Sequence, residues 1–265
     1  MSITNENPRF IVIIPSRYGS SRFPGKPLAK IGGEPMIARV CRQVEKTGLP
    51  MAVATDDRRI ADCVESLGYR AVMTSADHPN GTSRISEALA RLRDMGIEAD
   101  VAINVQGDEP FIDPTQIQAL ARTFVDEGDT MIATLCRRFD KANGFEALFD
   151  PNVVKLVFNL RMEAIYFSRS IIPYVRGVDW KQWLDTTDFF THVGIYAYRT
   201  ELLPRLVALP QTEHEKAESL EQLRWLDNGY TIKVRETDRP TVGIDTPEDL
   251  ERAEKFLEKY LKNGL

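Results

Sequence analysis

The stretch FIVIIPSRYGSSRFPGKPL, residues 10–28, joins an unbroken apolar run to a loop rich in positive charge. Its first five residues are apolar and mostly β-branched, which is typical of a strand buried on both faces. Such a strand needs a layer of helices on each side of its sheet. The run therefore predicts an α/β fold, with Arg17, Arg22 and Lys26 in the loop at the end of the first strand.

Strand-like and helix-like segments alternate along the first half of the chain. Apolar strand-like runs occur at 51–56, 70–74, 101–106 and 131–138. Between them, apolar residues recur at helical spacing from Met36, from Ile60, from Ile85 and over Pro114 to Val125. Strict alternation of this kind predicts a mostly parallel central sheet covered on both faces.

The pattern changes after about residue 140. The strand-like runs 153–159 and 163–169 are separated only by the residues LRM, which indicates a hairpin and a small antiparallel excursion. The segment 170–190 is predicted to be an irregular loop. We expect a single domain over residues 1–265, with a small lobe at about 150–200.

The last third of the chain returns to strands and helices. Residues 193–198 and 231–236 are predicted strands. Thr212 and Glu215 form a capping-box pair that opens a helix ending at Asn228-Gly229. Thr246-Pro247 is a second helix start.

Composition excludes several classes of protein. The 265 residues carry a net charge of −5, which does not suit a general nucleic-acid binder because phosphate-backbone affinity needs excess cations. Three scattered cysteines argue against a disulfide framework. Neither a membrane-spanning run nor a signal peptide is recognised, so we expect a cytoplasmic protein without membrane insertion.

The basic loop of residues 17–28 is a candidate phosphate site, because a glycine-bearing turn between a strand and a helix can face an anion. The two common fingerprints do not fit. A Walker A loop has four residues between its glycines and Ser or Thr after the lysine, whereas here five residues separate Gly19 from Gly25 and Pro27 follows Lys26. A solvated loop with surface charge is the alternative from these residues alone.

Two isolated acids follow predicted strands. Asp108, in NVQGDEP, lies where ligands of open α/β sheets usually bind. Asp245, in VGIDTPEDL, precedes a helix, and its simpler interpretation is a helix-start acid. Together with a basic loop, two carboxylates suit Mg²⁺, whose coordination substrate phosphates complete. Asp56 and Asp57 are weaker candidates, since they can simply cap the next helix.

Ordered motifs then connect the chain with one family. They are IPSRYGSSRFPGKPL, VATDD, MTSADHPNGTSR, NVQGDEPFIDP, YFSRSIIP, HVGIYAY, SLEQLRWLDNG and GIDTPEDLE. Over roughly residues 10–257 the chain resembles the bacterial 3-deoxy-manno-octulosonate (Kdo) cytidylyltransferases. It departs from them at Ser83, where the family usually has an acid, and in the loop 177–190. The resemblance implies a three-layer nucleotidyltransferase fold, GT-A or Rossmann-like, and Mg²⁺-dependent transfer of CMP from CTP to the sugar.

The resemblance also implies roles for single residues. Nucleotide binding would fall to Arg17, Arg22, Lys26, Thr74, Ser75, Arg84 and Gln106, and the metal to Asp108 and Asp245. Lys26, Arg17, Asp108 and Asp245 would carry catalysis. The sugar would be bound by Gln106, Arg169, His192, Tyr196, Glu221 and Gln222. On the predicted helix after Thr212, the face that bears Glu221 and Trp225 could instead be an ordinary solvated face.

Several alternatives stay open. The acceptor could be 8-amino-Kdo or another acidic sugar such as sialic acid. A non-catalytic nucleotide-sugar sensor would use the same binding residues without turnover. A glycosyltransferase is disfavoured because no D-x-D motif ends a strand. Family members typically form homodimers, and the contact would then lie in the excursion at 150–200.

Overall fold

The computed structural model of the protein describes residues 7–19, 23–241 and 243–262. Its centre is a nine-stranded sheet with seven strands in one path. In spatial order these are β11 (Ile232–Glu236), β7 (Ile132–Arg138), β10 (Phe190–Arg199), β6 (Val101–Asn104), β1 (Phe10–Ser16), β4 (Met51–Thr55) and β5 (Ala71–Met73). Neighbours are parallel except β10, which runs antiparallel to both β6 and β7. The predicted mostly parallel sheet is confirmed, but the antiparallel strand within it was not predicted.

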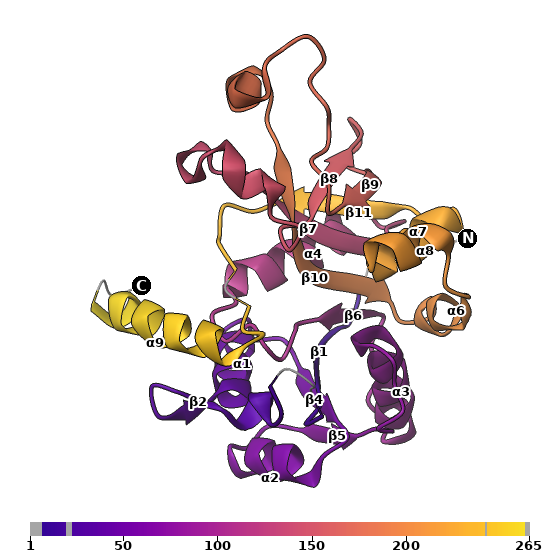
Figure 1. Ribbon diagram of the computed structural model, residues 1–265. Helices are drawn as coiled ribbons and strands as arrows, with labels where there is room; N and C mark the ends of the chain where they lie inside the picture. The colour runs from indigo at the N-terminus through magenta and orange to yellow at the C-terminus, as the bar shows by residue number, and fades with distance from the viewer. Residues whose placement is uncertain (1–6, 20–22, 242, 263–265) are drawn as a thin grey trace, which may run out of the picture.

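Two apolar cores lie on opposite faces of this sheet (Figure 1). Along β1, Ile11 and Ile13 face one core, and Val12 and Ile14 face the other. All four are almost fully buried, and burying each such side chain contributes about 1.5–3 kcal/mol. One helical layer contains α1 (Met36–Glu45), α2 (Arg58–Ser66) and α4 (Pro114–Asp126), and the other contains α3 (Gly81–Asp94), α6 (Leu203–Ala208) and α8 (Glu221–Asp227).

The single helix predicted from Thr212 to Asn228 is wrong. Thr212 does cap a helix, but α7 (Glu213–Glu218) stops at Ser219, whose φ of 50° is left-handed, and α8 begins two residues later. The carbonyl groups released at this break accept hydrogen bonds from the Arg169 guanidinium, at 2.6 Å for Glu218 and 3.4 Å for Ser219. Tertiary contacts therefore satisfy the break, and helical spacing alone could not reveal it.

The predicted hairpin is present as β8 (Lys155–Phe158) and β9 (Ala164–Ser168), which pair antiparallel and branch from β10. A small separate core that includes Phe139, Phe145 and Trp183 packs beside it. The segment 170–190 is largely irregular, as predicted, apart from the short α5 (Trp183–Thr186) and a preceding 3₁₀ turn. These parts project from the top of the molecule in Figure 1. The lobe as a unit of the domain stays a prediction.

The C-terminal helix α9 (Pro247–Lys262) packs against the small hairpin of β2 (Lys30–Ile31) and β3 (Glu34–Pro35) (Figure 1). The Phe111 and Phe256 rings meet at 4.9 Å, and the Gly32 N–H donates to Glu254 at 2.8 Å. Position 32 favours glycine because its φ of +56° is left-handed, and a Cβ there would also displace the end of the Leu257 side chain, 2.4 Å away. No helix among the described residues is long and apolar enough to cross a membrane.

Candidate active site

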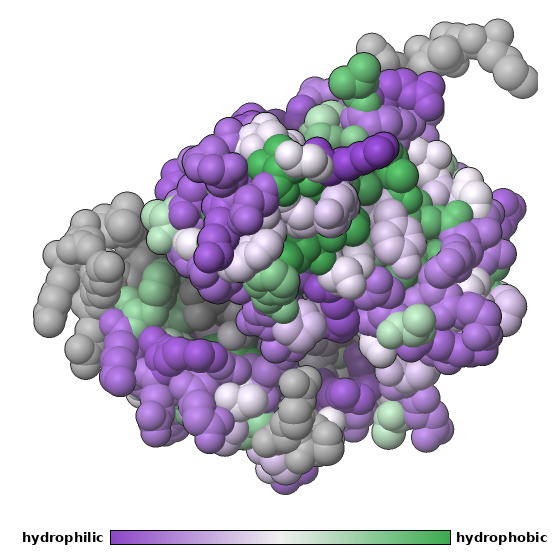
Figure 2. Space-filling model, turned by 45° about the horizontal axis from the view of Figure 1, so that its top comes forward, coloured by the Kyte–Doolittle hydropathy of each residue, from purple (hydrophilic) through white to green (hydrophobic). Residues whose placement is uncertain are grey.

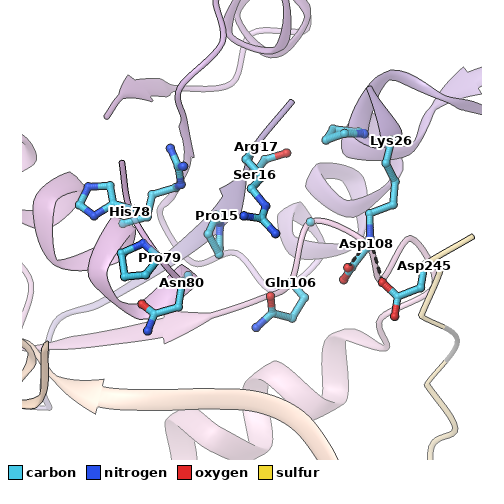
Figure 3. Close-up of a pocket in the computed structure, with 14 residues that line it drawn as sticks. Pro15, Ser16, Arg17, Lys26, His78, Pro79, Asn80, Gln106, Asp108 and Asp245 are labelled. Atoms are coloured by element: carbon cyan, nitrogen blue, oxygen red, sulfur yellow. Dashed lines mark hydrogen bonds and ion pairs between the residues drawn. The ribbon is translucent and has the colours of Figure 1, made fainter. Parts of the chain in front are cut away.

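A cavity of about 300 Å³ opens at the carboxyl ends of the central strands. Its walls are residues 15–17 after β1, residues 78–81 at the start of α3, and residues 106–108 after β6, joined by Lys26, Pro27, Arg84 and Asp245. Figure 3 shows Gln106 between Asn80 on one side and Asp108 on the other. The structure thus brings together five predicted site residues at the cavity, Arg17, Lys26, Gln106, Asp108 and Asp245, with Arg84 in its wall.

Lys26 lies between the two predicted metal acids. Its ammonium donates to Asp108 Oδ2 at 2.7 Å and to Asp245 Oδ1 at 3.2 Å (Figure 3). It also donates to the Ile244 carbonyl at 2.8 Å. An ammonium has three N–H donors, so each of them is used. Lys26 is mostly shielded while Asp245 is more than half exposed. The cluster therefore places one cation and two carboxylates at the wall of a solvent-accessible cavity.

Glycines bring these groups close together. Gly25, at φ +70°, turns the basic loop into the 3₁₀ helix that starts with Lys26, and its N–H donates to the Tyr18 carbonyl at 3.0 Å. A Cβ on Gly107 would lie 2.9 Å from the Pro15 carbonyl oxygen. The chain after β6 can therefore approach the chain after β1 only without a side chain at this position.

Arg84, which was predicted to bind the nucleotide, is almost fully buried in the wall of the cavity. Its guanidinium donates to Thr74 Oγ1 at 2.7 Å and to Asp56 Oδ2 at 3.2 Å. The other Asp56 oxygen accepts from the Tyr18 N–H at 3.3 Å. Asp56 thus ties the basic loop to α3. Thr74 and Ser75 do not line the cavity, and Arg22 lies outside the described residues.

A second group consists of four amino acids that are predicted to bind the sugar: Glu221, Tyr196, Gln222 and His192. A hydrogen bond to Asn80 links this group to the cavity. Asn80 donates to Glu221 Oε1 at 2.9 Å. Tyr196, paired with Asn104 in the sheet, and Gln222 on α8 are buried, and their hydroxyl and amide nitrogen have no hydrogen-bond partner in the described structure. Unpaired buried polar atoms are costly, which is consistent with a ligand that completes them. Trp225 is buried, so this face of α8 is not solvated.

His192 is the fourth member of this group. Its ring contacts Phe167 and Tyr196, and Nε2 lies 2.9 Å from Thr134 Oγ1. Burial lowers the pKa of His192 from 6.5 to about 3. The ring is therefore neutral at neutral pH and can bind a ligand by hydrogen bonding, although it cannot supply a positive charge for an anionic one.

Arg169 lies apart from these residues. It lines a different cavity, with Phe145, Phe149 and Trp180, and its guanidinium donates to the carbonyls of Pro151, Glu218 and Ser219. In this conformation it acts as a brace between β9 and the α7–α8 break. The structure does not bring it to the cavity that holds Lys26.

Sequence reasoning missed Asn80 and Asp56 as organising residues. Asn80 lines the cavity, caps α3 through a 2.9 Å bond from the Ser83 N–H, and contacts Glu221. Asparagine before Gly-Thr at a helix start is a recognisable capping signal. The sequence shows Asp56 only as an acid at the end of a predicted strand. Its contacts with Tyr18 and Arg84 join distant parts of the chain and could not be predicted from the sequence.

Comparison with known proteins agrees with this geometry. The family model described as Cytidylyltransferase matches residues 11–234. The 3-deoxy-manno-octulosonate cytidylyltransferase of Parabacteroides distasonis is 52% identical over 94% of this chain and 98% of that protein. The protein of the same name from Thermodesulfovibrio yellowstonii is 46% identical over 94% and 98%. The chain belongs to the 3-deoxy-manno-octulosonate cytidylyltransferase family.

Solved structures confirm the fold predicted for this cytidylyltransferase family member. A CMP:2-keto-3-deoxy-manno-octonic acid synthetase complexed with CTP is 40% identical, with a TM-score of 0.85 over 95% of this chain and 99% of that chain. A putative glucose-1-phosphate thymidylyltransferase from Bacillus anthracis, at 18% identity and a TM-score of 0.62, covers 93% and 94% and shares the fold. The predicted family resemblance and the nucleotidyltransferase fold are both confirmed.

Proposed function

We propose that the chain transfers CMP from CTP to the anomeric hydroxyl of Kdo, giving CMP-Kdo and pyrophosphate. The observation that carries this proposal is the convergence of Lys26, Asp108 and Asp245 at one cavity wall, in a chain of this family. The relatives carry the name of this activity, and the solved neighbour at 40% identity was determined with CTP. The product would serve lipopolysaccharide synthesis in the cytoplasm.

The chemistry needs positioning and charge neutralisation more than covalent help from the protein. The oxygen of the sugar hydroxyl attacks the α-phosphorus of CTP and forms a bond to it. The bond between this phosphorus and the oxygen that bridges to the β-phosphate breaks, and pyrophosphate leaves. Lys26 and Arg17 face the cavity and would neutralise the charge that develops on the phosphate oxygens. Ser16, whose buried hydroxyl has no partner in the described structure, is a further donor in the same wall.

The residues present fit Mg²⁺. Asp108 and Asp245 both lie within hydrogen-bond distance of one ammonium, so their carboxylates point to a common place. No group of three or more acidic, histidine or cysteine ligands occurs in the described part of the chain. The support for Mg²⁺ is the pair of carboxylates, since one or two carboxylates and substrate phosphates can hold that ion. When bound, the ion would neutralise phosphate charge and lower the pKa of the attacking hydroxyl.

A homodimer through the lobe is the last part of the proposal. Five of the eight large hydrophobic side chains that are exposed in the described structure lie between residues 149 and 180: Phe149, Leu160, Ile165, Tyr174 and Trp180. The space-filling view shows a mostly hydrophilic surface interrupted by apolar areas (Figure 2). Apolar side chains gathered on one projection favour a contact with a second copy. Sedimentation with Phe149→Ser and Ile165→Ser would test it, since a protein that is already monomeric before substitution contradicts the contact.

The activity test is incubation with CTP, Mg²⁺ and Kdo, with pyrophosphate and CMP-Kdo measured together. Lys26→Met should reduce turnover at least 100-fold, whereas Lys46→Met, at an exposed lysine whose ammonium donates to Gln43, should not. A folded wild-type protein that releases no pyrophosphate above background refutes the proposal. CTP binding without turnover of any acidic sugar would instead indicate a sensor. Comparing kcat/KM for Kdo, 8-amino-Kdo and sialic acid identifies the acceptor.

A further inference from the structure

The Glu221 carboxylate is held from the nucleotide side of the cavity. Oε1 accepts from Asn80 Nδ2 at 2.9 Å, and Oε2 accepts from Thr82 Oγ1 at 3.0 Å. Asn80, which caps α3, is 141 positions away from Glu221 in the sequence. Thr82, in the first turn of α3, is 139 positions away. Both oxygens of a residue on α8 therefore have their positions set by α3.

Asn80 performs two tasks with the two ends of one amide. Its oxygen caps α3, accepting from the Ser83 N–H at 2.9 Å, while its nitrogen donates to Glu221. The cap fixes the orientation of the amide, so the donor is aimed at α8. Thr82, which is almost fully buried, adds a second donor but does not line the cavity.

Arg224, three residues after Glu221 on the same helix, anchors α8 through other partners. Arg224 forms a buried ion pair with Glu215, with Nε 2.7 Å from Oε2, and donates to the Leu209 carbonyl at 3.1 Å. The backbone of α8 therefore has its own anchor. What the contacts from Asn80 and Thr82 add is the placement of the Glu221 carboxylate itself, close enough to the buried Tyr196 hydroxyl to interact with it electrostatically.

We propose that Asn80 and Thr82 are positioning residues that hold the Glu221 carboxylate in its sugar-binding orientation, so that the segment opening α3 on the nucleotide side also shapes the acceptor site. The inference rests on the proposed function, with Glu221 as a hydroxyl acceptor for the sugar. A carboxylate has about four lone-pair sites, so Glu221 can accept from both residues and still receive a sugar hydroxyl. Without the two donors the carboxylate would be free to rotate away.

The test is steady-state kinetics of Thr82→Val, which keeps the shape of the side chain and removes the hydroxyl without altering the cavity wall. A hydrogen bond to a charged group contributes enough for about a ten-fold effect or more. We expect KM for Kdo to rise about ten-fold, with KM for CTP changed less than about three-fold. Thr82→Ser should restore KM for Kdo. Thr123→Val, at a buried helical threonine bonded to Ala119, is the matched control.

Asn80→Ser gives an independent arm, because serine caps a helix as well as asparagine but its single short hydroxyl cannot cap α3 and donate to Glu221 in place of the amide nitrogen. The same selective rise in KM for Kdo is expected, with the thermal midpoint kept near that of the wild type. Combining Thr82→Val with Glu221→Gln completes a double-mutant cycle. If the hydroxyl acts through Glu221, the double variant should have a KM for Kdo close to that of Glu221→Gln alone.

Three outcomes would overturn the inference. They are an unchanged KM for Kdo in Thr82→Val, an equal rise in KM for both substrates, and fully multiplicative effects in the cycle. Wild-type protein that makes no CMP-Kdo refutes the proposed function itself, and the inference with it. Wild-type protein that makes CMP-Kdo, with Thr82→Val kinetically unchanged, refutes the positioning role alone.

Discussion

The backbone N–H of Ile244 donates a hydrogen bond to the carbonyl oxygen of Asp108 at 3.0 Å. This contact places the next residue, Asp245, beside the Asp108 side chain, although the two acids are 137 positions apart in the sequence. Lys26 donates to both side chains and to the Ile244 carbonyl. Ile244 also packs in an apolar cluster with residues of α9, β2 and Phe111, and this packing helps to hold Asp245 near Asp108. The proposed metal site is therefore a product of backbone pairing between two distant segments.

Asp108→Asn should preserve the fold and abolish most turnover. Asparagine has nearly the same shape, and the Lys26 ammonium keeps its contacts with Asp245 and the Ile244 carbonyl. Removing a charge that helps to hold Mg²⁺ should lower kcat about 100-fold or more. Pyrophosphate release across a Mg²⁺ titration measures this effect. Asp94→Asn, at an exposed position ending α3, is the control. A near-normal rate at saturating Mg²⁺ would remove Asp108 from the metal site.

Gly107→Ala should reduce both stability and turnover. The added Cβ would lie 2.9 Å from a backbone oxygen, that of Pro15, which cannot rotate away. We expect a loss of about 1–3 kcal/mol in the free energy of unfolding, together with a lower kcat because Asp108 follows directly. Urea denaturation and pyrophosphate release are the measurements. Gly128→Ala has no atom within 4 Å of the new Cβ and should lose less than about 0.5 kcal/mol. Equal stability of the two variants would contradict the close-approach explanation.

Asp56→Asn should weaken CTP binding. It removes the charge that faces the buried Arg84 guanidinium and weakens the link to the Tyr18 backbone in the basic loop. Leaving one partner of a buried pair uncompensated is costly, so we expect KM for CTP to rise about ten-fold or more. Asp57→Asn is the matched control, since asparagine also caps α2 and the lost ion pair with Arg59 is exposed. If both variants raise KM equally, Asp56 has no special role.

His192 should make the protein less stable as the pH falls. Its pKa is lowered from 6.5 to about 3 by burial, so protonation favours the unfolded chain. The neutral ring leaves stability unaffected above the unfolded pKa, and stability is lost as the pH falls from about 6.5 toward 3. His192→Gln should remove this loss, on the order of 1 kcal/mol between pH 7 and pH 5. Urea midpoints at the two pH values measure it.

The same histidine can be followed by NMR. Its ring signal, assigned by its absence from His192→Gln, should show no titration between pH 5 and pH 8. An inflection near pH 6.5 would show that the ring is solvated in the folded protein and would contradict the expected stability difference.

By itself, the sequence determined the alternation of strands and helices, the burial of the first strand on both faces and the family of the chain. Those features depend on neighbouring residues and on local motifs, which a linear pattern retains. It also identified Lys26, Asp108 and Asp245 as one group through the motifs that contain them, and these three do meet at the cavity.

Tertiary structure alone decided the insertion of antiparallel β10 between β6 and β7, the break at Ser219, the bracing position of Arg169 and the contact of Asn80 with Glu221. Each depends on groups that are far apart in the chain, such as Asn80 and Glu221, which are 141 positions apart. Local periodicity carries no information about which distant donor will satisfy a given carbonyl or carboxylate. The requirement that buried polar groups find partners is met only when the whole chain has folded.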